Sequence, residues 1–331
     1  MFFNMPSRLT FIFSLAIAGI SAGFDFDGIA IAQSHSVLPA TIELVGAESR
    51  QLVSVVELRG DYVSNAIDQS RYELETADPT VATVRDGMVI AIGDGETTLD
   101  CRIGDRVHRT PIRVSQTQQE RRWSFRNDVQ SVLAKLGCNA GACHGALAGK
   151  GGFRLSLRGY DSEHDFSTIT REAQGRRIEM ADPGRSLVLA KPSGALPHKG
   201  GLKLDTRSRD YRILSEWIAD GAESPSDDDP MLMRISVLPE NAMLGSGDHS
   251  QVLVNAHYDD GRVVDVTHWA KFSATDESVA VVDDEGLVTV QGHGEAAVLV
   301  WFGSKVVLAR MTVPYPNEVS EELYDNAPRR N

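Results

Sequence analysis

Two stretches of the chain alternate apolar and polar residues with a period of two, which is typical of half-buried β-strands. The first stretch runs from about residue 40 to 115, where Ile42 and Leu44 flank a polar residue and Asp86-Gly87 marks a turn. Its apolar runs are short, and none has the length or the period of a helix. We therefore expect this stretch to be all-β.

The second stretch lies near the C-terminus and repeats the first. The segment 77–82 (ADPTVA) matches 275–280 (TDESVA), and the turns that follow correspond as well. Cys101 falls opposite Val300 in this alignment and has the phase of a residue on the buried side of a strand. We therefore expect a packed thiol at Cys101 and not a reactive one.

Between the repeats, the apolar period changes to that of an amphipathic helix. One apolar stripe recurs at i, i+3, i+4 and i+7 and ends at Gly137, and it consists of Val129, Val132, Leu133 and Leu136. A second stripe, closed by Asp220-Gly221, consists of Tyr211, Leu214, Trp217 and Ile218. The period of each stripe predicts a helix, and the glycine after it predicts where the helix ends. The segment from about 120 to 225 is therefore expected to be mainly α.

The candidate chemistry directly follows the first predicted helix, in Cys138-Asn-Ala-Gly-Ala-Cys143-His144. Two cysteines followed at once by a histidine is the pattern that attaches haem c, although the usual spacing is C-x-x-C-H. The Cys-His step is kept, and small Gly141 lets the longer loop bulge. Two alternatives are a disulfide between the cysteines and a zinc site, and zinc would need four ligands. The motif predicts one covalent haem c, held by Cys138 and Cys143 with His144 on the iron.

The residues after the motif predict a short β ribbon, because Phe153, Leu155 and Leu157 alternate with Arg154, Ser156 and Arg158. One face of this ribbon would be apolar and the other basic. Arg154 and Arg158 could bind the two haem propionates, since guanidinium groups pair well with carboxylates. A solvated strand face explains the same pattern.

The termini and the charge indicate where the protein works. An apolar run from Leu9 to Gly23, before a small-x-small site at Ala30–Ala32, predicts a signal peptide over 1–32 and export, with no membrane span after its removal. An earlier cut after Ala22 and retention of the segment as an anchor are the alternatives. The net charge of −13 makes nucleic acid an unsuitable partner. The 331 residues suffice for two or three domains.

The repeat resembles the group 2 bacterial immunoglobulin-like (Big) module. The shared phrase is "S-x-V-A-x-V", a turn, and a strand that ends in a Gly-x-Gly turn, and the resemblance covers about 38–115 and 232–314. It implies two β-sandwiches of short strands. Such modules are mostly spacers or adhesive units of exported proteins, which implies surface or domain partners.

The segment 120–225 resembles the planctomycete-type cytochrome c domain. The matching phrases are Gly151 to Asp161, Asp182 to Pro192, Leu196 to Gly201 and Leu214 to Ala222. The fold class expected from both resemblances is multidomain, with all-β immunoglobulin-like sandwiches flanking a small, mainly α, cytochrome c-like domain. A tail over 315–331 would follow. In relatives further large domains often follow, so the chain could be a fragment of a longer architecture.

The resemblance also bears on the sixth iron ligand. Many relatives have a methionine in the loop before the final helix, and this chain has Leu196 at that place. His198 lies two residues further on, in a Pro/Gly loop, and is the favoured ligand. Met180 and an open iron position are the alternatives.

The function expected from the sequence is that of an exported electron carrier with one haem c, an unknown redox partner and no enzymatic activity. It would lie in the periplasm or at the cell surface. A haem peroxidase or sensor remains open if the iron has a free position. The alternative is a haem-free scaffold or adhesion protein of the cell surface, built on immunoglobulin-like modules.

Overall fold

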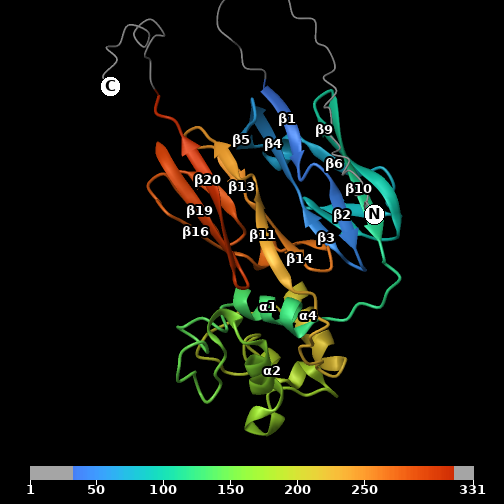
Figure 1. Cartoon of the computed structure of the whole chain (residues 1–331), viewed down its shortest axis with the longest axis vertical. Coiled ribbons are helices and arrows are strands. Elements are labelled where there is room, and N and C mark those ends of the chain that lie inside the picture. Colours follow the sequence, from blue (N-terminus) through green and yellow to red (C-terminus); the bar gives the residue numbers. More distant parts are fainter. Residues whose placement is uncertain (1–32, 317–331) are drawn as a thin grey trace, which may run out of the picture. The chain divides into compact units, whose positions relative to one another are not determined.

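The computed structural model describes residues 33–316 (Figure 1). The predicted signal peptide and all but the start of the predicted tail lie outside these residues. The described part contains twenty strands and four α-helices, so it is predominantly β. Along the chain, the strands form two modules, one before and one after a segment with short helices.

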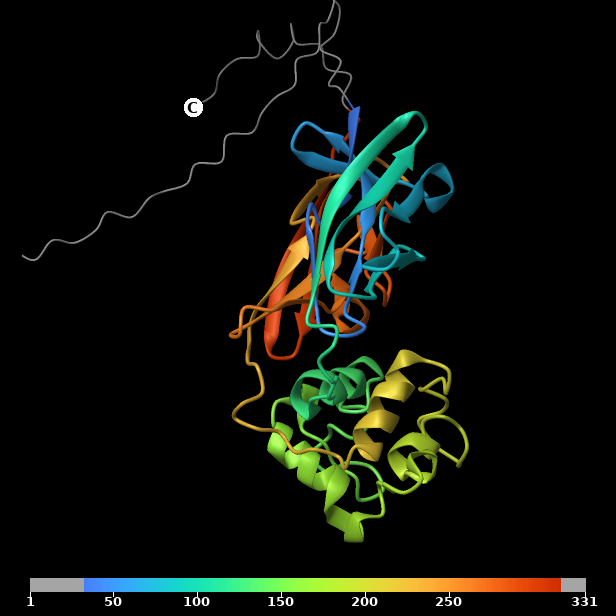
Figure 2. The ribbon, with the colours of Figure 1, turned by 90° about the vertical axis from the view of Figure 1, so that its right-hand side faces the viewer.

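The first β module contains the strands β1 (Gln33–Leu38), β2 (Ile42–Val45), β3 (Arg50–Leu52), β4 (Ser54–Arg59), β5 (Tyr62–Ala66), β6 (Glu73–Thr76), β7 (Ala82–Arg85), β8 (Met88–Ala91), β9 (Gly95–Ile103) and β10 (Arg106–Ser115). They pair in the orders β1-β4-β5, β2-β10-β9-β6 and β3-β8-β7. The long β9–β10 hairpin is seen in Figure 2. Buried side chains of these strands make a core of their own, and Cys101 is fully buried in it.

The second β module contains β11 (Leu232–Leu238), β12 (Asn241–Met243), β13 (His249–Gln251), β14 (Leu253–Tyr258), β15 (Val263–Asp265), β16 (Lys271–Ala274), β17 (Ala280–Val282), β18 (Leu287–Val290), β19 (Gly294–Phe302) and β20 (Lys305–Val313). Their orders are β11-β14-β15, β12-β20-β19-β16 and β13-β18-β17. These reproduce the pairing of the first module strand by strand. The predicted internal repeat is therefore a repeat of topology as well as of sequence.

One sheet runs through both modules. Strand β5 of the first module pairs in parallel with β12 of the second, at Val63 and Ala242, and the result is the seven-stranded order β1-β4-β5-β12-β20-β19-β16. The backbone N–H of Leu52 also donates a hydrogen bond to the Asp265 carboxylate. The modules are thus in direct contact, although more than a hundred residues separate them in the chain.

The helical segment, residues 116–231, joins β10 to β11. Its α-helices are α1 (Gln130–Lys135), α2 (Ser162–Thr170), α3 (Leu187–Ala190) and α4 (Arg209–Ala219). A π-helical turn, Phe125–Val129, leads into α1. Gly137 ends this helix with a φ of 72°, as the sequence indicated, and α4 carries the second predicted stripe on its buried face. Helix α2 was not expected, because only Phe166 and Ile169 interrupt its polar sequence with buried apolar side chains.

The expected fold class is wrong. The two sandwiches do not flank an independent, mainly α domain, because the described residues fall within one compact unit and the modules share a sheet. The four α-helices have 6, 9, 4 and 11 residues, and turns and irregular backbone make up most of the rest of the helical segment. Its buried side chains join those of the second module in a single core. No small helical cytochrome domain is evident in residues 33–316.

Helix α4 is held to the second module by buried polar contacts. The Asp210 carboxylate accepts hydrogen bonds from Trp269 Nε1 at 3.0 Å and from His268 Nε2 at 3.1 Å. Both partners lie in a single 3-10 turn, η6 (Thr267–Trp269), whose tryptophan is buried. The adjacent Arg209 guanidinium stands over the Trp269 ring, 5.2 Å from its centroid.

The predicted β ribbon at 153–158 does not form. Ser156 is buried and Leu157 is exposed, which is the reverse of the expected alternation. The cause is Asp165 on α2, which accepts hydrogen bonds from the Ser156 backbone N–H at 2.5 Å and from its hydroxyl at 2.7 Å. A polar anchor nine residues further on thus overrides the local pattern.

Candidate ligand-binding cleft

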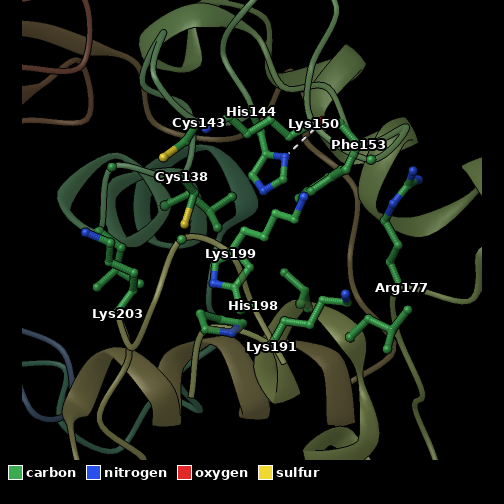
Figure 3. Close-up of a pocket in the computed structure, with 18 of the residues that line it drawn as sticks. Cys138, Cys143, His144, Lys150, Phe153, Arg177, Lys191, His198, Lys199 and Lys203 are labelled. Carbon is green, nitrogen blue, oxygen red and sulfur yellow. Dashed lines mark hydrogen bonds between the residues drawn. The ribbon is translucent and has the colours of Figure 1, made fainter. Parts of the chain in front are cut away.

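A cleft of about 920 Å³ opens between the end of α1, the loop that follows it, and the loop after α3 (Figure 3). Its walls include the apolar side chains Leu133, Leu136, Phe153, Leu187, Val188 and Pro192. Pockets of several hundred Å³ with apolar walls and a few polar groups are the usual sites for small ligands and cofactors. Cys138, Cys143, His144 and His198 all line this cleft, so four of the residues singled out in the sequence meet in one place.

The loop from Cys138 to His144 is closed by its own backbone. Cys138 N–H donates to the Leu133 carbonyl at 2.9 Å, which continues the end of α1, and His144 N–H donates to the Cys138 carbonyl at 2.9 Å. A third hydrogen bond joins Cys143 N–H to the Ala140 carbonyl at 2.9 Å. The widened spacing of the motif is therefore accommodated as a compact turn, and the histidine side chain enters the cleft (Figure 3).

His144 is fixed by a hydrogen bond to the backbone. Its Nδ1 lies 2.9 Å from the Phe153 carbonyl oxygen. Because a carbonyl can only accept, Nδ1 carries the proton, and in the neutral ring Nε2 keeps its lone pair. The pKa of His144 is lowered, chiefly by burial and further by the nearby His198 and Lys150. The neutral imidazole is therefore the favoured form.

His198 is fixed in the same way from the opposite side of the cleft. Its Nδ1 lies 3.0 Å from the Gly201 carbonyl oxygen, so this ring also has Nδ1–H as the donor. The loop wraps closely around the ring: a Cβ atom at Gly200 would stand 2.7 Å from His198 Cε1. Only glycine fits at that position without moving the imidazole.

The two imidazoles face each other across the cleft. Their ring centroids are 6.4 Å apart and their planes are within 10° of parallel. Figure 3 shows Cys143 and His144 on one side and His198 with Lys191 on the other. Histidines that bind a metal commonly donate their other N–H to a carbonyl or carboxylate, which fixes the tautomer and the ring orientation. Both rings satisfy this condition.

Cys138 and Cys143 are free thiols, so the predicted alternative of a disulfide between them is not formed in the structure. Burial raises the pKa of Cys138 to about 12, and the neighbouring Cys143 adds to the shift. The Cys138 sulfur is therefore held as a neutral thiol. Burial likewise raises the pKa of Cys101, to about 11, in agreement with its expected role as a packed core residue.

Three other candidates lie outside the cleft. Arg154 and Arg158, expected to bind two carboxylates of a ligand, do not line it, and the Arg158 guanidinium instead stands 5.9 Å from the centre of the Trp301 ring. Met180, the alternative iron ligand, is half exposed and is not a lining residue either. Arg154 and Arg158 lie elsewhere because their expected position depended on a β ribbon with a basic face, and this ribbon does not form.

The cations that do line the cleft were not predicted from any motif of the sequence. They are Lys150, Arg176, Arg177, Lys191, Lys199 and Lys203. The chain has only seven lysines, and four of them are in this list. That concentration within 54 residues, 150 to 203, was visible in the sequence and is the signal that could have found them.

No family model matches the chain, and no curated protein matches it. Among solved structures, domains 5–6 of the S-layer protein SbsC match over 85% of this chain and 98% of that one, at 11% identity and a TM-score of 0.32. Domains 4 and 5 of SbsC match over 78% and 90%, at 10% identity and a TM-score of 0.22. Invasin, a bacterial integrin-binding protein, matches over 85% and 59%, at 12% identity and a TM-score of 0.17.

The fold does not support the expected description of the chain as a haem-binding, metal-binding cytochrome c that transfers electrons. Residues 33–316 are predominantly β, and no small helical cytochrome domain is evident among them. Within the same residues, no group of three or more His, Cys, Asp or Glu side chains could hold a metal ion. The zinc alternative fails for that reason, since structural zinc takes four ligands.

Within residues 33–316, no helix is long and apolar enough to cross a membrane.

Proposed function

We propose that the chain is an exported scaffold protein of the cell surface or extracellular space, built on its two β modules. The observation that carries this proposal is the seven-stranded sheet, which joins the repeated modules through β5 and β12. A sheet shared by two modules resists their separation and leaves their outer strands available to partners.

Localisation tests this proposal. The full chain, expressed in a bacterial host, should lose residues 1–32 and should react with a membrane-impermeant biotin reagent on intact cells. N-terminal sequencing of the labelled protein gives the cleavage site. The control is the same chain without residues 1–32, which should stay in the cytosol unlabelled. Full-length protein that keeps Met1 and escapes labelling would contradict export.

A second candidate function is the binding of a flat cofactor in the cleft, between His144 and His198. The parallel rings and their fixed tautomers favour it, because each leaves one Nε2 lone pair for a ligand. Haem c stays the prediction for this cofactor, and electron transfer to a redox partner stays the prediction for its use. In that case His144 and His198 would hold the iron and the thiols of Cys138 and Cys143 the ring edge. Such a group supplies one-electron chemistry when bound.

The test is a denaturing gel stained for haem peroxidase activity, on protein co-expressed with a cytochrome c maturation system. Covalent haem survives the gel, and we expect Cys143→Ala to lose more of it than Cys138→Ala. In the stained protein, His198→Ala should turn a low-spin spectrum into a high-spin one. A colourless wild-type protein would rule out haem c and leave the scaffold proposal standing.

A further inference from the structure

We infer that the cleft selects a ligand that has an apolar body and at least two anionic groups, and that lysines, not Arg154 and Arg158, bind these groups. The inference deepens the second candidate function, because it states the charge of the ligand. It does not depend on iron, on haem or on covalent attachment.

The first support is the charge of the lining. Six lysines and arginines and two histidines line the cleft, whereas no aspartate or glutamate does. The whole chain carries a net charge of −13, so a lining without a single acid runs against the composition. A positive surface partly enclosed by apolar walls raises the local concentration of anions.

The second support is that the lysines are available. Lys150, Lys191, Lys199 and Lys203 are exposed at the cleft, and none forms a salt bridge with an acid among residues 33–316. Arg177 differs from them. Its guanidinium is buried, donates to the Thr168 and Gly152 carbonyls and lies 3.7 Å from Glu172, so it supports the wall of the cleft.

The third support is the placement of the lysines by the backbone. Lys191 and Lys203 come from opposite ends of the loop that carries His198, and Lys203 N–H donates to the Pro192 carbonyl at 2.8 Å, which ties these ends together. Lys199 directly follows His198, and Lys150 lies near His144 (Figure 3). Positive charges therefore reach the cleft from both sides, which fits anionic groups at more than one edge of a ligand.

The apolar walls define the rest of the ligand. Leucine, valine, proline and phenylalanine side chains form much of the lining, and a fully hydrophilic anion such as phosphate would leave them exposed to water. A flat ring system with two carboxylates satisfies both the walls and the lysines. A volume of about 920 Å³ is large enough for such a molecule.

Metal-free deuteroporphyrin, a flat dicarboxylate, and its uncharged dimethyl ester are the matched probes. The full chain, produced without a cytochrome c maturation system, is titrated with each while porphyrin fluorescence is recorded. We expect the dicarboxylate to bind at least tenfold more tightly than the ester, and its affinity to fall as salt is added. Equal binding of the two probes, or binding of neither, would overturn the inference.

Substitutions locate the charge. Replacing a single exposed cation changes binding by about twofold to fivefold, so Lys191→Gln, Lys199→Gln and Lys203→Gln combined should weaken dicarboxylate binding by about tenfold or more. Lys305→Gln, on β20, is the control for the loss of a lysine elsewhere and should bind normally. Arg154→Gln with Arg158→Gln should also bind normally. A loss in the arginine variant with none in the lysine variant would reverse the assignment.

The porphyrin titration and the haem-stained gel report on different proposals. A positive titration with a colourless gel keeps the anionic-ligand cleft and removes haem c. His144→Ala and His198→Ala should keep most of their affinity for the metal-free probe, because there is no iron for the imidazoles to ligate.

Discussion

The two β modules contain the same 3-10 turn and use it differently. In the first module this turn, η1 (Gln69–Arg71), is exposed, and the Arg71 side chain forms a salt bridge of 3.4 Å with Glu57 of the same module. In the second module the corresponding turn is η6, where Trp269 takes the place of Arg71 and His268 that of Ser70. There the tryptophan is buried, and both side chains bind Asp210 of α4.

The second module packs against the helical segment although its topology is the same as that of the first module. Both copies keep their strand orders, and two different residues in one short turn give the second module two additional hydrogen bonds to the helical segment. The first module accordingly has a separate core, whereas the core of the second continues into the helices that wall the cleft. The cleft should therefore depend on the second module more than on the first.

The largest effect is expected for Trp269→Ala. This substitution empties a buried aromatic site and removes a donor to Asp210, and changes of this kind cost about 3–5 kcal/mol. Arg71→Ala is the matched control at the corresponding position of the first module and should change the free energy of unfolding by less than about 0.5 kcal/mol. Urea unfolding of both variants measures the difference. Similar losses in the two would mean that η6 does not hold the helical segment.

A smaller effect is expected for Asp210→Ala. It leaves the buried Trp269 N–H without an acceptor, which costs about 1–3 kcal/mol. Asp68→Ala removes the carboxylate that caps η1 at an exposed site and should cost less. Thermal unfolding of the two variants side by side gives the ranking. A larger loss for Asp68→Ala would contradict it.

A pH dependence should follow from His268. Its pKa is raised, first by the hydrogen bond to Asp210 and further by the Asp210 and Glu285 charges. A raised pKa means that its contribution to stability is complete below the ordinary value of about 6.5 and is lost as the pH rises through the raised value. Stability should therefore fall as the pH rises above about 6.5, and His268→Gln should make this part of the profile flatter. Parallel profiles for wild type and variant would show that the ion pair contributes nothing.

The smallest effect is expected for Cys101→Val, which gives the first module the residue that the second has at Val300. Both side chains are fully buried at corresponding positions of β9 and β19. A swap of similar volume usually costs less than about 1.5 kcal/mol. Guanidinium unfolding checks this. A loss above about 3 kcal/mol would show that the two cores are packed differently despite the repeat.

Local pattern predicted the β modules well, because their strands alternate and the repeated turn recurs at a fixed spacing. It could not predict the pairing of β5 with β12, since no local feature of Val63 or Ala242 indicates a partner so far along the chain. Nor did it predict the docking turn. In the sequence, the turn η6 differs from η1 mainly by Trp269 in place of Arg71. A single aromatic residue makes no periodic pattern from which a contact with α4 could be predicted.

In the cleft, too, local motifs were predicted and features that depend on distant residues were not. The Cys138–His144 motif and the Pro/Gly loop around His198 were sufficient to identify four of the lining residues, which are Cys138, Cys143, His144 and His198. The arginines were misplaced because Asp165 captures Ser156 and abolishes the ribbon. The lysines were missed because each one alone resembles an ordinary surface residue. Only the folded structure shows that four of them line the same cleft.

The β5–β12 pairing has a mechanical consequence. The two modules are linked twice, once by the covalent path through residues 116–231 and once by the sheet, so together the two links close a ring. A protease that cuts the chain at exposed Asp227 or Asp228, shortly before β11, opens this ring at one point. The sheet and the contacts between the helical segment and the second module then carry the whole load, and the severed halves stay together until both are pulled apart.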